Sequence, residues 1–326
     1  MGLSVHSLWV PSGDRAAELR ANLEPTIHLT LGPDLPDPAG YDVLIAGRPG
    51  REHLDASPNL RTLVIPWAGL PESTRELLLQ YPHIAVHNLH YNALPVAEHA
   101  IALLLAAAKS LVPMDRSLRA HDWTPRYQRI PSILLAGKTA LILGYGAVGR
   151  HIARLCHALG LEVLAVRRHG SGAQAGEKDP SAPATELANL LPRADAVFVC
   201  LPHTPATDGL IGAKELALLP PGAILINIGR GPIVDEAALY EALHDRTLFA
   251  AGLDVWYRYP EDKAARSNTP PAAYPFHELD NVVMSPHRAG HTAEAETLHL
   301  EHLARLLNAA ARGEPLPNPV DLEAGY

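Results

Sequence analysis

Cysteine is scarce in this sequence, with only Cys156 and Cys200 among 326 residues. One falls on a predicted helix and the other at a predicted strand end, which fits neither a disulfide framework nor a zinc site. We interpret both as core thiols. The sequence also lacks 18 consecutive apolar residues, and residues 1–14 contain neither a basic region nor a long apolar core. We therefore expect no transmembrane helix and a cytoplasmic location.

An excess of positive charge is also missing. The formal net charge of −8 and the pI near 6.1 argue against a nucleic-acid partner or an anionic membrane surface. Three histidines, His83, His87 and His90, lie on a predicted strand and its exit loop, without acidic partners or i, i+4 helical spacing, so we expect no metal site. The hydrophobic content of 47% and the length predict a globular protein of two domains with a small-molecule partner.

The most informative stretch runs from Lys138 to Arg168 and predicts a strand, a glycine turn, a helix and a second strand. Gly144, Gly146 and Gly149 have the spacing G-x-G-x-x-G between that strand and that helix. In this context the pattern is typical of a dinucleotide-binding turn, in which the glycines permit a tight turn, close approach of a pyrophosphate and close helix packing. The helix N–H groups would face the phosphates.

A carboxylate is missing at the end of the second strand, where an NAD site would hold the ribose 2′-hydroxyl. Arg167, Arg168 and His169 stand there instead. Arginine binds phosphate in a bidentate manner and stays charged at any working pH, so this pair favours the 2′-phosphate of NADP, with NAD still possible. A solvated basic strand end is the alternative.

Strands and helices alternate along the rest of the chain, which predicts an α/β fold. Residues 1–95 form a small α/β layer domain, and a long apolar helix at 96–111 is the first crossing between domains. Residues 112–137, rich in Pro, Arg and aromatic residues, are either an arm with a dimer contact or a solvated loop. The strands that follow residue 138 continue one doubly wound parallel sheet, interrupted by loops at 170–183 and 260–278. An amphipathic helix at 292–311 closes the chain.

Five motifs in order, the glycine turn, LPHTPAT, INIGRGPIVDEAAL, AGLDVW and SPHRAG, resemble the D-isomer-specific 2-hydroxyacid dehydrogenase family. This family includes glycerate, phosphoglycerate and formate dehydrogenases, and the resemblance extends from about residue 60 to residue 291. It implies a Rossmann cofactor domain, residues 97–290, inserted into a smaller flavodoxin-like substrate domain formed by residues 1–96 and 291–326. The active site would lie in the cleft between them, and family habit implies a homodimer.

The resemblance assigns Arg230 to the substrate carboxylate and the 2-oxo group, and His287 to proton transfer. Elementary chemistry supports both assignments. Hydride delivery to a carbonyl builds negative charge on oxygen, which an arginine fork can stabilise while it orients the carboxylate. The proton needs a donor that titrates near neutrality, and histidine is the usual one.

The resemblance also implies the residues that contact ligands. Those on the cofactor side are Gly144, Gly146, Ala147, Val148, Gly149, Arg167, Arg168, Leu201, Pro202, Thr207, Ile228 and Asp254, the last beside the nicotinamide carboxamide. Those on the substrate side are Ala68, Gly69, Leu70, Asn92 and Arg230.

The sequence departs from the family where D-V-F-x-x-E-P is normal, because it reads DVWYRYP. The family's Glu holds and charges the catalytic His, and Tyr259 occupies its place. Formate dehydrogenases have Gln there, so the change does not abolish hydride chemistry. Glu261, two residues on, is an alternative partner for His287. Arg288 is also unusual and would either bind a second anionic group of the substrate or face solvent.

These features predict an NADP-preferring dehydrogenase or 2-oxoacid reductase. The alternative is a nucleotide-dependent binding protein like the transcriptional corepressors that share this fold, although the presence of Arg230 and His287 favours an enzyme. Formate oxidation is a further possibility, supported only by Asn92 and the missing Glu.

Overall fold

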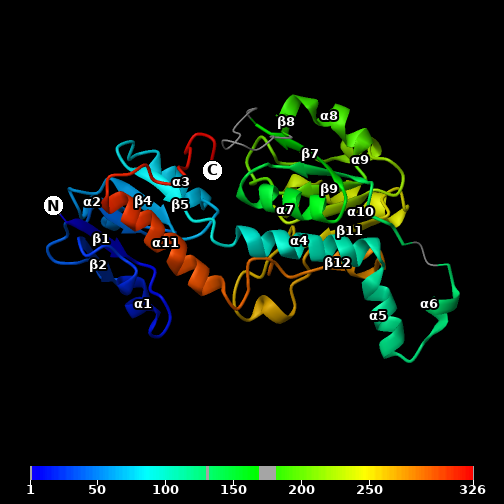
Figure 1. Cartoon of the computed structure of the whole chain (residues 1–326), viewed down its shortest axis with the longest axis horizontal. Coiled ribbons are helices and arrows are strands. Elements are labelled where there is room, and N and C mark those ends of the chain that lie inside the picture. Colours follow the sequence, from blue (N-terminus) through cyan, green and yellow to red (C-terminus); the bar gives the residue numbers. More distant parts are fainter. Residues whose placement is uncertain (1, 130–131, 169–180, 326) are drawn as a thin grey trace. The chain divides into compact units, whose positions relative to one another are not determined.

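The computed structural model describes residues 2–129, 132–168 and 181–325. The chain divides into two compact units, which Figure 1 shows in sequence colours. Unit 1 consists of Met1–Asn92 and His291–Tyr326, and unit 2 of Ala93–Gly290. The boundary expected at residue 96 lies inside a helix that begins at Ala93. His169 lies outside the described residues.

Unit 1 contains a five-stranded parallel sheet in the order β2-β1-β3-β4-β5, which is the flavodoxin-like order. Its strands are β1 Leu3–Ser7, β2 Ile27–Leu31, β3 Val43–Ile45, β4 Thr62–Ile65 and β5 Ala85–Asn88. Its helices are α1 Arg15–Ala21, α2 Arg51–Asp55, α3 Glu72–Leu78 and α11 Ala295–Ala311. The central strands are buried because both faces of a parallel sheet are covered by helices.

The returning helix α11 completes the core of unit 1. It packs against α1 and β2, and buries Leu300, Leu303 and Leu307 against strand residues such as Val5. Apolar residues spaced three and four apart place these leucines on one face. The predicted C-terminal helix is thus present, and it starts three residues later than expected.

Unit 2 contains a seven-stranded parallel sheet in the order β12-β11-β10-β9-β6-β7-β8. Its strands are β6 Thr139–Leu143, β7 Glu162–Arg167, β8 Ser181–Pro183, β9 Ala196–Val199, β10 Ile224–Asn227, β11 Ala250–Leu253 and β12 Val282–Met284. Its helices are α4 Ala93–Ala108, α5 Leu111–Arg119, α6 Thr124–Tyr127, α7 Ala147–Ala158, α8 Leu187–Leu190, α9 Ala213–Ala217 and α10 Glu236–His244. This is the doubly wound Rossmann sheet that the sequence predicts, and the strand order reverses between β6 and β9.

Helix α4 packs along α7 and across β10, β11 and β12. A Cβ atom on Gly252 of β11 would lie 2.7 Å from the Cβ of Leu103, so glycine is needed for this close approach. The helix ends at Ala108, three residues before the predicted end, because Ser110 adopts a left-handed conformation with φ of 49°. A new helix, α5, begins directly after it.

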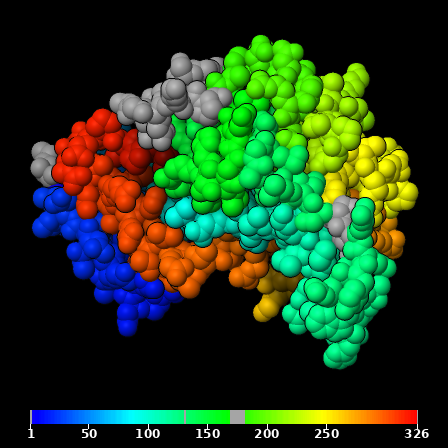
Figure 2. Space-filling model, turned by 45° about the vertical axis from the view of Figure 1, so that its right-hand side comes forward, coloured from blue at the N-terminus to red at the C-terminus, as the bar shows by residue number. Residues whose placement is uncertain are grey.

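One segment differs from the sequence-based expectation, and a second is defined more closely by the structure. The end of the predicted loop 170–183 forms β8, which extends the sheet beside β7. Residues 111–127 form α5 and α6, which project as a lobe at the edge of unit 2 (Figure 2). Exposed apolar side chains lie on and after these helices, namely Leu111, Leu118, Trp123, Tyr127 and Leu134.

Among the described residues, no single helix is long and apolar enough to cross a membrane, and α4 and α5 have that length and apolar character only as a pair bent by 68°. No group of three or more metal-ligating side chains occurs among the same residues. Both cysteines are free thiols, and burial raises the pKa of each.

A buried histidine links the stability of unit 1 to pH. The ring of His299 on α11 is stacked on Tyr91 at 4.4 Å and lies 4.1 Å from the ring of Trp9. Its Nε2 is buried and has no hydrogen-bond partner among the described residues. Burial lowers the pKa of His299 to about 4, against a smaller opposing effect of Glu296.

We predict that unit 1 loses stability as the pH falls from about 6.5 to about 4. In that window the unfolded chain binds a proton at His299 that the folded chain does not, at a cost of up to roughly 3 kcal/mol. His299→Phe should keep the stacking and reduce the pH dependence of the urea midpoint. His83→Phe, at an exposed site, is the control and should have the same pH dependence of the urea midpoint as the parent. Identical profiles for His299→Phe and the parent would contradict this assignment.

Candidate active site

The glycine turn after β6 forms a cradle at the start of α7. Gly144 has φ of 101°, and a Cβ on Gly149 would lie 2.1 Å from the carbonyl oxygen of Gly144, so both positions require glycine. A Cβ on Gly146 would have no neighbour within 4 Å, which leaves open space at the helix N-terminus. No side chain caps this end and its first turn has no acidic residue. The N–H groups of Ala147 and Val148 thus belong to an N-terminus that suits a pyrophosphate.

Two arginines lie next to this cradle. Strand β7 ends at Arg167, its neighbour Arg168 is exposed, and the N–H of Gly144 donates to the carbonyl of Val166 at 2.9 Å. Since β6 and β7 are paired in parallel, their carboxyl ends meet at one edge of the sheet. The arginines therefore stand beside the glycine turn without an intervening strand.

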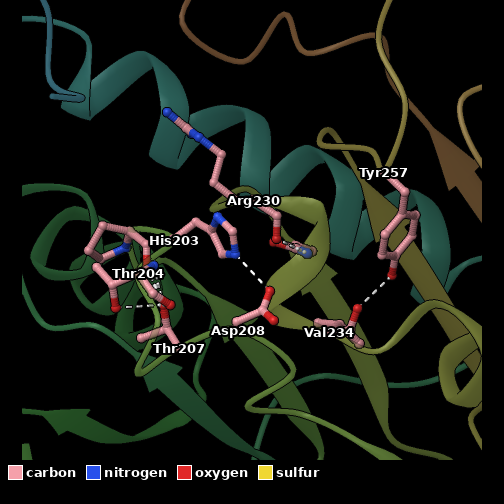
Figure 3. Close-up of polar contacts among 9 residues, drawn as sticks. His203, Thr204, Thr207, Asp208, Arg230, Val234 and Tyr257 are labelled. Carbon is pink, nitrogen blue, oxygen red and sulfur yellow. Dashed lines mark hydrogen bonds and ion pairs between the residues drawn. The ribbon is translucent and has the colours of Figure 1, made fainter. Parts of the chain in front are cut away.

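The loop after β9 borders the glycine turn on its other side, where the strand order reverses. A Cβ on Gly144 would lie 2.9 Å from the carbonyl oxygen of Cys200, just before Leu201 and Pro202. The Thr207 hydroxyl donates to the Pro202 carbonyl at 2.7 Å and accepts from the N–H of Thr204 at 2.8 Å. Figure 3 shows these bonds, together with the contact of 2.7 Å between His203 and Asp208. The hydroxyl of Thr207 thus closes the loop itself, and its contact with a cofactor stays a prediction.

Arg230 projects from the turn after β10, between two glycines that touch backbone on either side (Figure 3). A Cβ on Gly229 would lie 2.7 Å from the carbonyl oxygen of Leu201. A Cβ on Gly231 would lie 2.4 Å from the carbonyl oxygen of Trp256. The turn is therefore wedged between the loops after β9 and β11, and Arg230 is exposed at the carboxyl edge of the sheet.

Asn227 orients this turn. Its side-chain amide donates to the carbonyl of Arg230 at 3.0 Å, and its side-chain oxygen accepts from the N–H of Gly229 at 3.1 Å. The side chain of Ile228 packs in the core below the sheet edge. Any contact of Ile228 with a cofactor would be made by its backbone.

His287 and Tyr259 contact each other on the same edge. The hydroxyl oxygen of Tyr259 lies 3.0 Å from Nδ1 of His287 and accepts a hydrogen bond of 3.1 Å from the N–H of Trp256. Both side chains are exposed. His287 has φ of 57°, a left-handed conformation that is unusual outside glycine and that the loop must hold in place.

Electrostatics connect this pair with Arg230. Tyr259 is 46% exposed, and burial of the rest of its side chain raises its pKa, while the N–H of Trp256 and the positive charge of Arg230 act in the opposite direction. Tyr259 is therefore a neutral hydroxyl at pH 7, and Arg230 lies close enough to influence it. The three predicted catalytic residues thus occupy one neighbourhood of unit 2.

Asp254 holds the loop that carries His287. Its Oδ1 accepts from the hydroxyl of Ser285 at 2.5 Å and from the N–H of Arg288 at 2.9 Å, and its Oδ2 accepts from the N–H of Ala289 at 2.9 Å. The side chain is 1% exposed. These hydrogen-bond donors to the side chain all lie in the loop, while the predicted contact of Asp254 with the nicotinamide stays a prediction.

Two residues of this network escaped the sequence reasoning. Nε2 of His99, in the second turn of α4, lies 3.0 Å from the hydroxyl of Ser285. The available signal was a histidine inside a largely apolar helix. It could not name a partner, because Ser285 lies 186 positions along the chain.

Unit 1 contains the predicted carboxylate loop. Within the described part of the chain, the N–H groups of Ala68, Gly69 and Leu70 donate to no protein acceptor. The side-chain amide of Asn88 fixes the loop by donating to the carbonyl of Ala68 at 2.8 Å. Consecutive N–H donors of this kind suit an anion.

The other predicted residues have less defined surroundings. Asn92 is half-buried at the end of unit 1. Glu261 is exposed, two residues beyond Tyr259, and the observed contact at Nδ1 of His287 favours Tyr259 as the partner. The side chain of Arg288 is exposed, while its N–H is held by Asp254.

Comparisons with known proteins identify the family. Residues 101–289 match the model of the D-isomer specific 2-hydroxyacid dehydrogenase, NAD binding domain. The chain is 32% identical over 325 residues to D-3-phosphoglycerate dehydrogenase of Mycobacterium leprae, covering 100% of this chain and 56% of that protein. It is 34% identical over 237 residues to glycerate dehydrogenase of Methylorubrum extorquens, covering 71% and 69%.

The fold comparison agrees. The structure of a D-isomer specific 2-hydroxyacid dehydrogenase from Xanthobacter autotrophicus, in complex with NADPH, matches with a TM-score of 0.77 and 26% identity, covering 100% of this chain and 99% of that one. The chain spans about half the length of the phosphoglycerate dehydrogenases that it matches. On these grounds the chain belongs to the D-isomer specific 2-hydroxyacid dehydrogenase family.

Proposed function

We propose that this protein is an NADP-preferring oxidoreductase that interconverts small 2-oxo acids and 2-hydroxy acids. The observation that carries the proposal is the contact of Tyr259 with His287 beside the charge of Arg230, at the carboxyl edge of a Rossmann sheet. Ligands of open α/β sheets bind at this edge, next to the strand reversal. Names of relatives add weight, because they include a glycerate dehydrogenase.

The cofactor would be held by the glycine cradle and by Arg167 and Arg168. The uncapped start of α7 suits the pyrophosphate, and the two guanidinium groups suit a 2′-phosphate. The Xanthobacter structure contains NADPH, which supports the same preference. When bound, a reduced nicotinamide dinucleotide supplies the hydride for carbonyl reduction.

Arg230 would bind the substrate carboxylate and stabilise negative charge on the carbonyl oxygen. The guanidinium presents parallel N–H donors, so one side chain can serve both oxygens. Its turn is fixed by Gly229, Gly231 and Asn227, so little reorganisation is needed at the moment of reaction.

His287 would deliver the proton to the alkoxide from Nε2, since Tyr259 contacts Nδ1. The imidazolium carries a proton on each ring nitrogen, and loss of the Nε2 proton leaves the Nδ1–H tautomer, so the tyrosine hydroxyl oxygen can accept from Nδ1–H before and after the transfer. It therefore orients both protonation states, but it offers no negative charge to stabilise the imidazolium. Glu261 is the alternative partner for His287.

Ala68, Gly69, Leu70 and Asn92 are the proposed substrate contacts in unit 1. The exposed apolar side chains of α5 and α6 support a homodimer contact through this lobe.

A corepressor-like nucleotide-binding protein is the alternative function, and absence of turnover would favour it.

A screen of glyoxylate, hydroxypyruvate, pyruvate and phenylpyruvate with NADPH and NADH, followed by absorbance, tests the proposed reaction. Reduction of at least one 2-oxo acid is expected, and NADPH should be the better cofactor. Absence of turnover with all four acids would count against an oxidoreductase of small 2-oxo acids.

The first prediction about this reaction concerns the cofactor. Arg167→Asp should weaken NADPH binding about tenfold or more and leave NADH binding nearly unchanged, because a charge-assisted phosphate contact contributes roughly 1.5–3 kcal/mol. Dissociation constants of both cofactors provide the measurement. Arg193→Asp, an exposed arginine before β9 at the opposite edge of the sheet, is the charge-matched control. Equal affinity of the parent protein for NADH and NADPH would rule out the preference.

The next prediction concerns Arg230. Arg230→Ala should lower kcat/KM by several orders of magnitude and leave the NADPH dissociation constant unchanged, because this arginine acts on the substrate and not on the cofactor. Steady-state kinetics and cofactor titration separate the two effects. Arg193→Ala should behave like the parent. Parent-like turnover of Arg230→Ala would rule out the proposed role of Arg230 in the reaction.

A third prediction concerns Tyr259. Reduction needs protonated His287, and an ionised carboxylate at position 259 would favour the imidazolium. Tyr259→Glu should therefore move the alkaline decline of kcat/KM for reduction upward by about one pH unit or more. A deuteride isotope effect must accompany the profile, to establish that chemistry limits the rate. An unmoved decline would mean that Tyr259 does not support His287 and would favour Glu261.

A further inference from the structure

A chain of hydrogen bonds runs from α4 to the loop that carries His287. It consists of His99, the hydroxyl of Ser285 and the carboxylate of Asp254, and all three belong to unit 2. We propose that His99 and Ser285 are positioning residues, which act through Asp254 to hold His287 in the orientation needed for proton transfer. This inference rests on the proposed function of His287.

The number of protons available on Ser285 and Asp254 determines the direction of each hydrogen bond. Ser285 has one hydroxyl proton and donates it to Oδ1 of Asp254 at 2.5 Å. The serine oxygen can then only accept at its contact of 3.0 Å with His99, so Nε2 of His99 carries a proton. The same nitrogen lies 3.6 Å from Oδ1 of Asp254, which adds attraction between the two residues.

Four bonds converge on the short loop that follows β12. Asp254 receives the hydroxyl of Ser285 and the N–H groups of Arg288 and Ala289. The indole N–H of Trp256 donates to the carbonyl of Ser285 at 2.8 Å. Residues on both sides of His287 are thereby fixed.

This fixation matters because of the backbone at His287. Its φ of 57° lies in the left-handed region, which a side chain with a Cβ rarely adopts. Such a conformation persists where the surroundings hold it, and it then sets the direction of the side chain. An error of about 1 Å in a reacting group can cost roughly a hundredfold in rate.

His99 also stands at a distinctive place in the chain. It lies in the second turn of α4, which begins directly after unit 1, and its partner loop ends at the return to unit 1 after Gly290. The chain therefore enters unit 2 through α4 and leaves it through the loop of Ser285, and the bond between His99 and Ser285 links these two segments within unit 2. The side chain of His99 is 31% exposed and that of Asp254 is 1% exposed, so Asp254 anchors the network.

Single and double substitutions test the proposal. His99→Leu and Ser285→Ala should each lower kcat about 10- to 100-fold, with NADPH affinity within about twofold of the parent. His99→Gln places an amide donor near the position of Nε2 and should restore most of kcat. The double variant should be no slower than the slower single variant, because both remove the same bond.

A second measurement does not depend on turnover. The N–H groups of Arg288 and Ala289 donate to Asp254, so hydrogen exchange of the peptide spanning 285–290 should be faster in His99→Leu and parent-like in His99→Gln. His157→Leu makes the same replacement at an exposed position of α7 and is the matched control, with no expected change in kcat or exchange.

Each result has one meaning. If the kcat losses of the two single variants multiply in the double variant, the positioning role is overturned. The same holds if His99→Gln is as slow as His99→Leu. Parent-like kcat and exchange in His99→Leu would also overturn it, provided that His287→Gln is strongly impaired. Unimpaired turnover in His287→Gln would instead overturn the proposed function of His287 itself.

Discussion

Close approach of backbone to backbone at the carboxyl edge of the unit 2 sheet is the constraint on which the site depends. A Cβ atom at Gly144, Gly149, Gly229 or Gly231 would fall within 3 Å of a carbonyl oxygen of a neighbouring segment. Glycine removes these clashes and lets the loops after β6, β9, β10 and β11 lie against one another. The cradle at α7 and the turn of Arg230 are both products of this packing.

Tyr259 and His287 are brought together in a different way. They meet through side chains, with Tyr259 bonded to His287 and Asp254 bonded to the loop around it. The neutral hydroxyl of Tyr259 contacts the imidazole without contributing a negative charge. In the proposed reaction, substitution at this position would alter the pH range of catalysis while leaving the position of the histidine intact.

Helix α4 connects these two parts physically. It packs over β10, β11 and β12 closely enough to require Gly252, and the same helix carries His99 to the loop of His287. A helix that covers a sheet for hydrophobic reasons thus also supplies a polar contact near its start. The lobe of α5 and α6 lies beyond its other end, where Ser110 adopts a left-handed conformation.

The sequence by itself determined the features that depend on near neighbours. Strand and helix alternation, the G-x-G-x-x-G turn and the order of the motifs predict the doubly wound sheet, and the structure contains it. Helix ends were less predictable, because the end of α4 is set by the conformation of one residue, Ser110. Residues 181–183 read as loop because three residues carry no periodicity, and only pairing with β7 makes them a strand.

Tertiary structure alone decided which side chains meet. The family resemblance put Tyr259 in the slot of a catalytic glutamate, yet the choice between Tyr259 and Glu261 as neighbour of His287 depended on how the loop after β11 runs. The contact of His99 with Ser285 spans 186 positions and had no local signal beyond a polar residue in an apolar helix. Local sequence encodes backbone periodicity and turn chemistry, whereas contacts between distant side chains arise only when packing brings separate elements to the same edge of the sheet.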